Sequence, residues 1–368
     1  MKKIFLLLVL SSLLNQYALA TKHIPLLNPE PYDTIMSGKA VKLYTISNGQ
    51  IAAQITNYGG FVVALFTPDK NGEYVNIVTN YPDIHKYPTA NIGMVGPSLG
   101  RYANRIANGQ FTIGDQEYNT TKNNGPHTLH GGTQGFDHMV WDVKKANKKE
   151  LVLKCVLNDG ADGFPGTLTT TLTYSITKDN GLSISYKATT DKTTVVNLSN
   201  HTYFNLDGDG DIMNHLLTVN ADSITETDRS GIPSGKFIKV DGTLYDFRKP
   251  VVIGDRTASF PKGFRFGQKI EIPKDKVMSY DNNFCVSHKS KTAPEKVASL
   301  YSTESGRLME VWNNHPGLQI YTGARKAIAL ESQMYPDSPN HANFPSTILK
   351  PGQTYRHTCI YKFSVMKQ

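Results

Sequence analysis

Apolar and polar side chains alternate with a period of two along most of this chain. In the run T-L-T-T-T-L-T-Y-S-I, Leu168, Leu172 and Tyr174 share one face of an extended chain, and threonines occupy the other. This period is typical of a β-strand with one buried face, because successive side chains of a strand point to opposite sides. The dipeptide Asn180-Gly181 follows, and the alternation then resumes. Asn-Gly between two such runs predicts a tight hairpin.

The same combination of alternation and turns elsewhere predicts an all-β fold. Turn sequences at residues 47–49 and 69–72 also end in Asn-Gly, and the basic run at residues 144–149 has the composition of a solvated hairpin turn. Segments with helical periodicity are scarce, whereas Thr, Val, Ile and Tyr, which favour strands, are plentiful. Residues 255–300 mix Pro, Lys and Gly and are predicted to form long loops. We therefore expect one large antiparallel β-sandwich over residues 25–366.

The first twenty residues have a different composition from the rest of the chain. Lys2 and Lys3 precede an apolar run that starts at Ile4, and the segment ends in A-L-A at residues 18–20. This arrangement is that of a secretory signal with an A-x-A cleavage site, and the segment is short for a permanent membrane anchor. No later segment resembles a membrane span. The sequence predicts a signal peptide at residues 1–20 and a single domain over residues 21–368. It also predicts an exported protein, periplasmic or secreted, with no stable membrane anchor.

Charge and cysteine content exclude some classes of protein. The formal charge of +8 includes Lys2 and Lys3, so removing the signal leaves 8 − 2 = +6. The clearest basic cluster, residues 144–149, lacks interleaved aromatic residues, and nucleic-acid binding is therefore not predicted. Only Cys155, Cys285 and Cys359 are present, which allows at most one disulfide. A chain of 368 residues can be held by its core alone, so we interpret them as buried thiols.

The stretch N-L-S-N-H-T-Y-F-N-L, residues 197–206, raises the question of function. If it forms one strand, one face carries hydrogen-bonding side chains centred on His201, and the opposite face is mostly apolar. Polar groups also gather at G-R-Y-A-N-R-I, which holds Arg101, Asn104 and Arg105, at H-T-L-H-G-G, and at the C-terminal segments P-G-L-Q-I-Y-T-G and A-L-E-S-Q. Glu331 in the last segment follows three apolar residues, an unusual place for a carboxylate unless it is paired or reactive.

Two patterns that resemble metal sites are incomplete. His127 and His130 are three residues apart, but no Cys or nearby carboxylate completes a set of ligands. The run D-G-D-G-D, residues 207–211, resembles the start of a calcium-binding loop. The pattern then requires Gly where Ile212 stands and Glu where Thr218 stands. No metal site is predicted, and residues 207–211 are interpreted as a polar turn.

Taken together, these segments resemble the aldose 1-epimerases, also called galactose mutarotases. The matching segments are N-Y-G-G at 57–60, G-R at 100–101, A-N-R-I at 103–106, T-L-H-G-G at 128–132, D-G-F-P-G at 162–166, N-H-T-Y-F-N-L at 200–206, Y-D-F-R at 245–248, Y-D-N-N-F at 280–284, P-G-L-Q-I-Y-T-G at 316–323, L-E-S-Q at 330–333 and F-P-S-T-I-L-K-P-G at 344–352. The resemblance implies a galactose mutarotase-like supersandwich with an open sugar cleft. It also implies interconversion of the α and β anomers of free hexoses such as galactose and glucose, without metal, nucleotide or redox cofactor.

The resemblance further implies which residues carry the reaction. Glu331 matches the base that removes the proton of the C1 hydroxyl, and His201 matches the acid that protonates the ring oxygen. His130 matches a second histidine that holds the sugar. One base and one acid suffice for ring opening and closure.

Four further residues match sugar-binding positions of the family: Asn104, Arg105, Asp281 and Gln319. A carboxylate such as that of Asp281 suits a hold on two neighbouring hydroxyls, because it accepts several hydrogen bonds. The family more often has His where Asn282 stands, which puts the local geometry in question. The expected partner is a small monosaccharide, and the expected assembly is a monomer or weak dimer.

Two other functions remain open at this level. A hexose-6-phosphate 1-epimerase would need additional basic residues around the cleft, and Arg101 and Arg105 do not decide the matter. A non-catalytic carbohydrate-binding protein on the same fold would need the hydroxyl-binding residues but no acid–base pair. A glycosidase is not one of these two, because it would require two carboxylates flanking the bond and no histidine acid.

Overall fold

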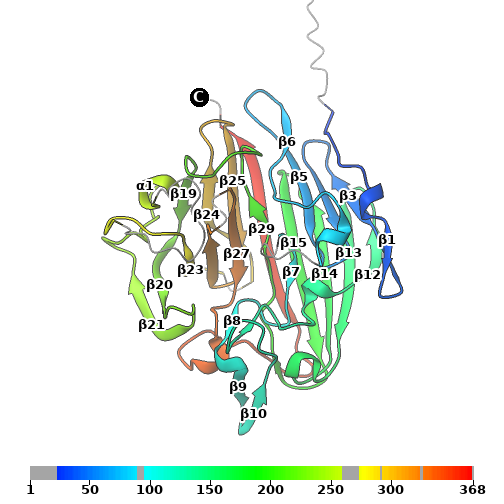
Figure 1. Cartoon of the computed structure of the whole chain (residues 1–368), viewed down its shortest axis with the longest axis vertical. Helices are drawn as coiled ribbons and strands as arrows, with labels where there is room; N and C mark the ends of the chain where they lie inside the picture. Colours follow the sequence, from blue (N-terminus) through cyan, green and yellow to red (C-terminus); the bar gives the residue numbers. More distant parts are fainter. Residues whose placement is uncertain (1–22, 89–94, 259–272, 291, 324–325, 367–368) are drawn as a thin grey trace, which may run out of the picture.

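The computed structural model describes residues 23–88, 95–258, 273–290, 292–323 and 326–366. Figure 1 shows a molecule built almost entirely of strands, and every pair of named strands is antiparallel. The predicted signal peptide lies outside the described residues. Within the described ranges, no helix is long and apolar enough to cross a membrane.

One large sheet forms the first layer. In spatial order its nine strands are β12 (Asp142–Ala146), β13 (Glu150–Leu157), β14 (Leu168–Ile176), β15 (Gly181–Thr190), β29 (Tyr355–Val365), β25 (Arg307–Asn313), β24 (Glu295–Tyr301), β19 (Leu216–Val219) and β22 (Val251–Val252). The predicted hairpins at Asn180-Gly181 and at residues 144–149 are confirmed, since they join β14 to β15 and β12 to β13.

Two smaller sheets form the second layer. The six-stranded sheet has the order β18 (Tyr203–Phe204), β27 (Ile328–Gln333), β26 (Gly317–Tyr321), β23 (Asp281–Val286), β20 (Ala221–Thr227) and β21 (Pro233–Lys239). The four-stranded sheet has the order β3 (Leu43–Ser47), β4 (Ala52–Thr56), β5 (Val62–Pro68) and β6 (Tyr74–Asn76). The predicted turns at residues 47–49 and 69–72 join its strands.

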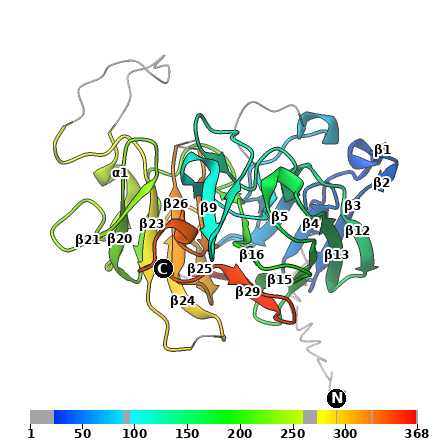
Figure 2. The same ribbon diagram turned by 90° about the horizontal axis from the view of Figure 1, so that it is seen from below.

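The two smaller sheets are joined where Ile77–Thr79 runs beside β18. The Asn205 N–H donates to the Ile77 carbonyl at 2.8 Å, and the Thr79 N–H donates to the Tyr203 carbonyl at 3.0 Å. Figure 1 and Figure 2 place β20 and β21 at one end of the molecule and β12 and β13 at the other. The expected large antiparallel sandwich is therefore the observed architecture.

Apolar side chains of both layers share one continuous core. Phe204 of β18 packs on Tyr361 of β29 with ring centroids 4.7 Å apart, and the Tyr361 hydroxyl donates to the Leu330 carbonyl at 2.8 Å. Burial of such side chains supplies most of the stabilisation of a fold of this kind. All three cysteines are free; Cys155 and Cys359 are buried, and Cys285 is half-buried.

Short elements complete the fold. The two-stranded ladders are β1 (Thr34–Met36) with β2 (Lys39–Val41), β7 (Ser98–Leu99) with β17 (Ser199–Asn200), β8 (Arg105–Ile106) with β11 (Thr128–Leu129), β9 (Gln110–Ile113) with β10 (Gln116–Asn119), and β16 (Thr194–Val195) with β28 (Ile348–Leu349). The helical turns are α1 (Ile253–Arg256), η1 (Glu30–Tyr32), η2 (Ile84–Lys86), η3 (Ala107–Gly109), η4 (Phe136–His138), η5 (Ala161–Gly163) and η6 (Ser338–Asn340).

The prediction of long loops over residues 255–300 is wrong in part. β23 lies in this range and β24 begins in it, and each pairs with neighbours on both sides. Residues 259–272 and 291, to which the prediction also applies, lie outside the described residues. The sequence D-N-N-F-C-V of β23 begins with residues that are depleted in strands. Its extended conformation therefore depends on β20 and β26, which the local sequence does not reveal.

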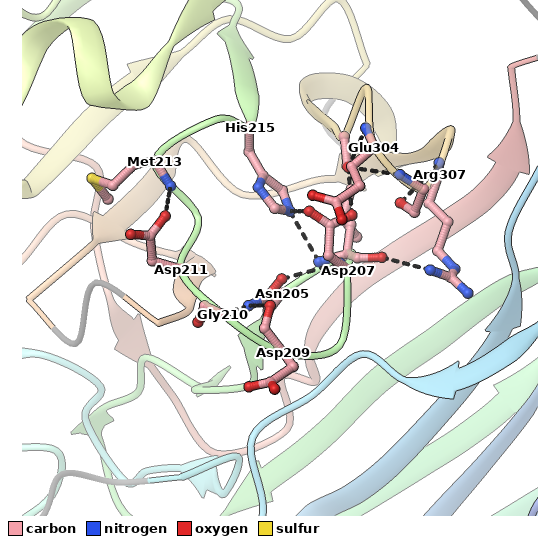
Figure 3. Close-up of polar contacts among 12 residues, drawn as sticks. Asn205, Asp207, Asp209, Gly210, Asp211, Met213, His215, Glu304 and Arg307 are labelled. Carbon is pink, nitrogen blue, oxygen red and sulfur yellow. Dashed lines mark hydrogen bonds and ion pairs between the residues drawn. The ribbon is translucent and has the colours of Figure 1, made fainter.

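The run D-G-D-G-D forms a turn whose carboxylates do not converge (Figure 3). Asp207 accepts from the Ser302 hydroxyl, and Asp211 accepts from the Met213 N–H at 3.0 Å. The Asp209 carbonyl, not its carboxylate, accepts from Asn205 at 3.1 Å. These contacts agree with the interpretation as a polar turn.

Candidate active site

All seven residues that the family pattern identifies as catalytic or sugar-binding line one cavity of about 240 Å³. Its lining consists of Asn104, Arg105, Leu129, His130, His201, Tyr203, Asp281, Gln319, Tyr321 and Glu331. Pockets for drug-sized ligands have volumes of roughly 300–1,000 Å³. A cavity below that range, lined almost entirely by residues that carry a polar group, fits a small, hydroxyl-rich molecule.

Strand register places the polar side chains of three neighbouring strands on one face of the six-stranded sheet. Asn283 of β23 lies opposite Gln319 of β26, which lies opposite Glu331 of β27. The intervening Leu318 and Leu330 point into the core. Because a strand alternates its faces, Gln319 and Glu331 must both face the cavity.

The stretch at residues 197–206 does not form the single strand that its alternation predicts. β17 ends at Asn200 and β18 begins at Tyr203, and the two residues between them belong to neither strand. The Asn200 side-chain oxygen accepts from the Thr202 N–H at 3.1 Å, a local bond that competes with regular strand pairing. Along the predicted polar face, only His201 and Tyr203 reach the cavity.

The remaining polar side chains of that stretch hold the main chain in place. Asn197 donates to the Ala103 carbonyl at 3.0 Å and accepts from the Met334 N–H at 2.8 Å. Ser199 donates to the Ser332 carbonyl at 2.8 Å. These bonds tie the segment that carries His201 to the strand that carries Glu331.

Asn104 and His130 are held together by reciprocal hydrogen bonds. The His130 N–H donates to the Asn104 carbonyl at 2.9 Å, and the Asn104 N–H donates to His130 Nδ1 at 3.1 Å. Both residues have a positive φ, 63° for Asn104 and 54° for His130, which the surrounding bonds must maintain. Because Nδ1 accepts, a neutral His130 carries its proton on Nε2 and is a hydrogen-bond donor there. Burial, with His201 and Arg105 nearby, lowers the pKa of His130 well below its usual range.

Arg105 and Gln319 both approach the Asp281 carboxylate. Arg105 Nη2 lies 3.8 Å from Asp281 Oδ2, and Gln319 Nε2 donates to Asp281 Oδ1 at 2.6 Å. The Asp281 side chain is 41 % exposed, so it remains accessible to a ligand. The three groups supply two donors and one acceptor on one wall of the cavity.

His201 and Glu331 form a buried pair at the bottom of the cavity. Nε2 of His201 lies 3.5 Å from Oε1 of Glu331, and their side chains are 9 % and 2 % exposed. His201 Nδ1 and Glu331 Oε2 have no partner in the described part of the chain. Buried polar atoms are normally paired, so this pair is arranged to receive further polar groups.

Burial shifts the pKa values of the two groups in opposite directions. It raises the pKa of the Glu331 carboxyl well above its usual range; the Asp281 carboxylate raises that pKa further, and Arg105 lowers it. Burial also lowers the pKa of His201 to about 4. Both shifts disfavour charge, as expected for groups removed from water. The pair therefore holds one proton over a wide pH range, either as neutral imidazole and carboxylic acid or as imidazolium and carboxylate.

Arg101 and His127 do not line the cavity. Arg101 is buried, and its Nη1 donates to the Pro165 carbonyl at 2.6 Å and to the Thr194 hydroxyl at 3.1 Å. His127 Nδ1 accepts from the Asn108 N–H at 3.0 Å. Both residues therefore stabilise loops, and Arg105 is the one cation among the lining residues.

Leu129, Tyr203 and Tyr321 also line the cavity, although the sequence analysis assigns none of them a catalytic or sugar-binding role. Tyr203 and Tyr321 share strand faces with His201 and Gln319 in the sequence, and that period is the signal that could have identified them. Over the described ranges, no three His, Cys, Asp or Glu side chains are placed so that they could hold a metal ion.

The comparisons with a family model and with curated proteins agree on one family. A model of the family described as aldose 1-epimerase matches residues 42–362. The galactose mutarotase of Bos taurus is 34% identical over 354 residues, which cover 90% of this chain and 97% of that protein. The aldose 1-epimerase of Escherichia coli (strain K12) is 32% identical over 347 residues, covering 89% and 96%.

Solved structures share the fold. An aldose epimerase homologue from C. elegans superposes with a TM-score of 0.80 at 28% identity, covering 89% of this chain and all of that one. The galactose 1-epimerase from Lactobacillus acidophilus NCFM gives a TM-score of 0.75 at 25% identity, with 91% and 97% covered.

Proposed function

The chain belongs to the aldose 1-epimerase family, and we propose that it interconverts the α and β anomers of free hexoses, with galactose and glucose as substrates. The observation that carries this proposal is the buried His201–Glu331 pair at the bottom of a cavity whose walls offer hydroxyl-binding groups. A binding protein on the same fold has no use for such a pair.

The reaction needs one proton removed and one proton supplied. Glu331 takes the proton of the C1 hydroxyl while His201 protonates the ring oxygen, so the ring opens to an aldehyde. Rotation about the C1–C2 bond presents the other face of the carbonyl. The reverse proton transfers then close the ring as the other anomer.

The single proton of the pair is sufficient for this chemistry. Imidazolium with carboxylate has the same number of protons as imidazole with carboxylic acid, and the two forms differ by one transfer across the 3.5 Å gap. Burial favours the uncharged form at rest, and a hydroxyl that donates to Glu331 Oε2 favours the charged one. Sugar binding thereby converts the resting pair into the reactive base and acid.

The walls of the cavity hold the sugar. The second N–H of Gln319, the Asn104 amide, Arg105 and the Nε2–H of His130 supply donors, and Asp281 supplies acceptors. Since Arg105 is the one arginine or lysine among the lining residues and faces Asp281, the cavity favours a neutral hexose over its 6-phosphate.

Polarimetry of freshly dissolved sugars tests the proposal. We expect the purified protein to accelerate the change in optical rotation of α-galactose and α-glucose in proportion to its concentration. We expect galactose 6-phosphate and glucose 6-phosphate to be poorer substrates by kcat/KM. Preference for the 6-phosphates would instead support a phosphosugar epimerase, and binding without acceleration would support a carbohydrate-binding protein.

A further inference from the structure

Three buried amide side chains lie behind Asp281 on adjacent strands. Asn283 belongs to β23, Gln319 to β26 and Gln333 to β27, and they are 1 %, 4 % and 0 % exposed. Gly317, opposite Gln333, makes room for them, because a Cβ at Gly317 would lie 2.4 Å from Asn283 Oδ1. The β26 strand therefore has no side chain at the one position where it would separate Gln333 from Asn283.

Hydrogen bonds connect these amides in one direction. Gln319 Nε2 donates to Asp281 Oδ1 at 2.6 Å, and Gln333 Nε2 donates to Gln319 Oε1 at 3.2 Å. The second N–H of Gln333 donates to Asn283 Oδ1 at 3.1 Å. Both amide hydrogens of Gln333 are thus used, and Gln319 Oε1 is matched with a donor.

The Asp281 carboxylate determines the direction in which these hydrogen bonds run. A carboxylate has only acceptor atoms, so the Gln319 amide must turn its nitrogen toward Asp281. Its oxygen then faces Gln333, and the Gln333 nitrogen must face it. If Gln333 offered an acceptor instead, the Gln319 amide would lie between two acceptors, and its nitrogen could satisfy only one of them.

We propose that Gln333 is a positioning residue that fixes the orientation of the Gln319 amide and thereby the donor–acceptor pattern offered to the sugar. This inference rests on the proposed function for the nature of the ligand. In the fixed orientation, Gln319 keeps one N–H for a hydroxyl, and the Asp281 carboxylate stays in place for two others. Reversal of the Gln319 amide would remove that donor and repel Asp281.

The variant Gln333→Glu tests the proposal because the introduced carboxyl group can switch. When protonated it has one O–H, which can donate to Gln319 Oε1 as the wild-type amide does. When ionised it has only acceptors and repels Gln319 Oε1, which opposes the orientation in which the Gln319 amide donates to Asp281. We expect the Kd and KM for galactose, each divided by the wild-type value at the same pH, to be near one at pH 5. At pH 8 and above we expect both ratios to rise about tenfold or more, the effect of losing one hydrogen bond to a charged group.

Two further variants distinguish an effect on the orientation of Gln319 from a general loss of folding or stability. Gln333→Met removes both donors at similar length, so we expect a raised Kd that does not depend on pH. Gln54→Glu places the same substitution at an equally buried glutamine on β4, whose amide contacts Leu27 and Thr45 outside the cavity. We expect that control to leave the pH dependence of Kd and KM unchanged. Thermal unfolding shows whether each variant is folded.

The possible results are distinguishable. Wild-type protein that neither binds nor anomerises a free hexose would refute the proposed function itself. Active wild type with a folded Gln333→Met variant of unchanged Kd would refute the positioning role alone, whether or not Gln333→Glu folds or its buried carboxyl group ionises by pH 9.

Discussion

Glu331→Gln is the perturbation that separates binding from proton transfer. The amide has the shape of the carboxyl group and can hydrogen-bond the C1 hydroxyl, but it cannot accept that proton. Asp281 is a poor substitute, since its carboxylate is committed to Gln319 at 2.6 Å and is 41 % exposed on the wall of the cavity. No third carboxylate lines the cavity as described.

The expected loss of kcat follows from the proposed role of Glu331 as the general base. General base catalysis contributes typically ~10²–10⁴-fold, and each factor of ten corresponds to about 1.36 kcal/mol of barrier. With no substitute base on the cavity floor, we expect kcat to fall by about 10³-fold or more. kcat/KM should fall in parallel, because the lost interaction is one made in the transition state.

Glu331→Gln lowers activity but should raise the stability of the fold at high pH, because the pKa of Glu331 is higher in the folded than in the unfolded state. Glu331 has a folded-state pKa above its unfolded value, so its stabilising contribution is present below about pH 4.5 and is lost as pH rises through the folded-state pKa. Gln cannot ionise, so the variant avoids that loss. We expect its Tm to exceed that of wild type at pH 8 and to approach it at pH 4.

Polarimetry of α-galactose and thermal unfolding over this pH range measure both effects. Normal turnover by Glu331→Gln would refute the assignment of the base and leave Glu331 a sugar-binding role. A lower Tm than wild type at pH 8 would contradict the inferred cost of ionising the buried carboxyl group.

Three further predictions follow from the same site and from the N-terminal sequence. His201→Asn should keep the Kd for galactose within a few-fold while kcat falls ~10²–10⁴-fold; near-normal kcat would assign the acid to His130 instead. The pH profile of kcat/KM should fall below about pH 4, where His201 takes up a second proton, and again above the raised pKa of Glu331, where the pair loses its proton. An acid limb with its midpoint between pH 5 and 7, rather than near pH 4, would contradict the one-proton pair. The native protein should begin at Thr21, as measured by intact mass; a mature form that begins at Met1 and stays in the membrane would refute the signal peptide.

Much of the fold can be predicted from local sequence because hairpins are local structures. Asn-Gly turns and period-two alternation identify β14 and β15, whose register runs without a break from Leu168 to Ile176. The alternation in β26 and β27 likewise predicts the face on which Gln319 and Glu331 lie, and the paired register of the two strands agrees with it.

Long-range contacts account for what local sequence does not predict. β23 starts with Asp and Asn residues and forms a strand because β20 and β26 pair with it. The break after Asn200 depends on a side-chain bond to Thr202 that a strand pattern does not reveal. Arg105 and Asp281 lie far apart in the sequence and meet only in the folded cavity. Family resemblance carries such long-range information, and the seven residues that it identifies all lie in one cavity.

Anomer exchange at equilibrium tests the central claim most directly, namely that His201 and Glu331 act as one acid–base unit. NMR exchange spectroscopy on the anomeric protons of galactose gives the rate of interconversion without a change in concentration. We predict fast exchange with wild type at pH 7 and slow exchange with His201→Asn and with Glu331→Gln. The double variant should be no slower than the slower single variant, because groups that act as a unit are not additive. Exchange by the double variant at the wild-type rate, or losses that multiply fully, would contradict the account.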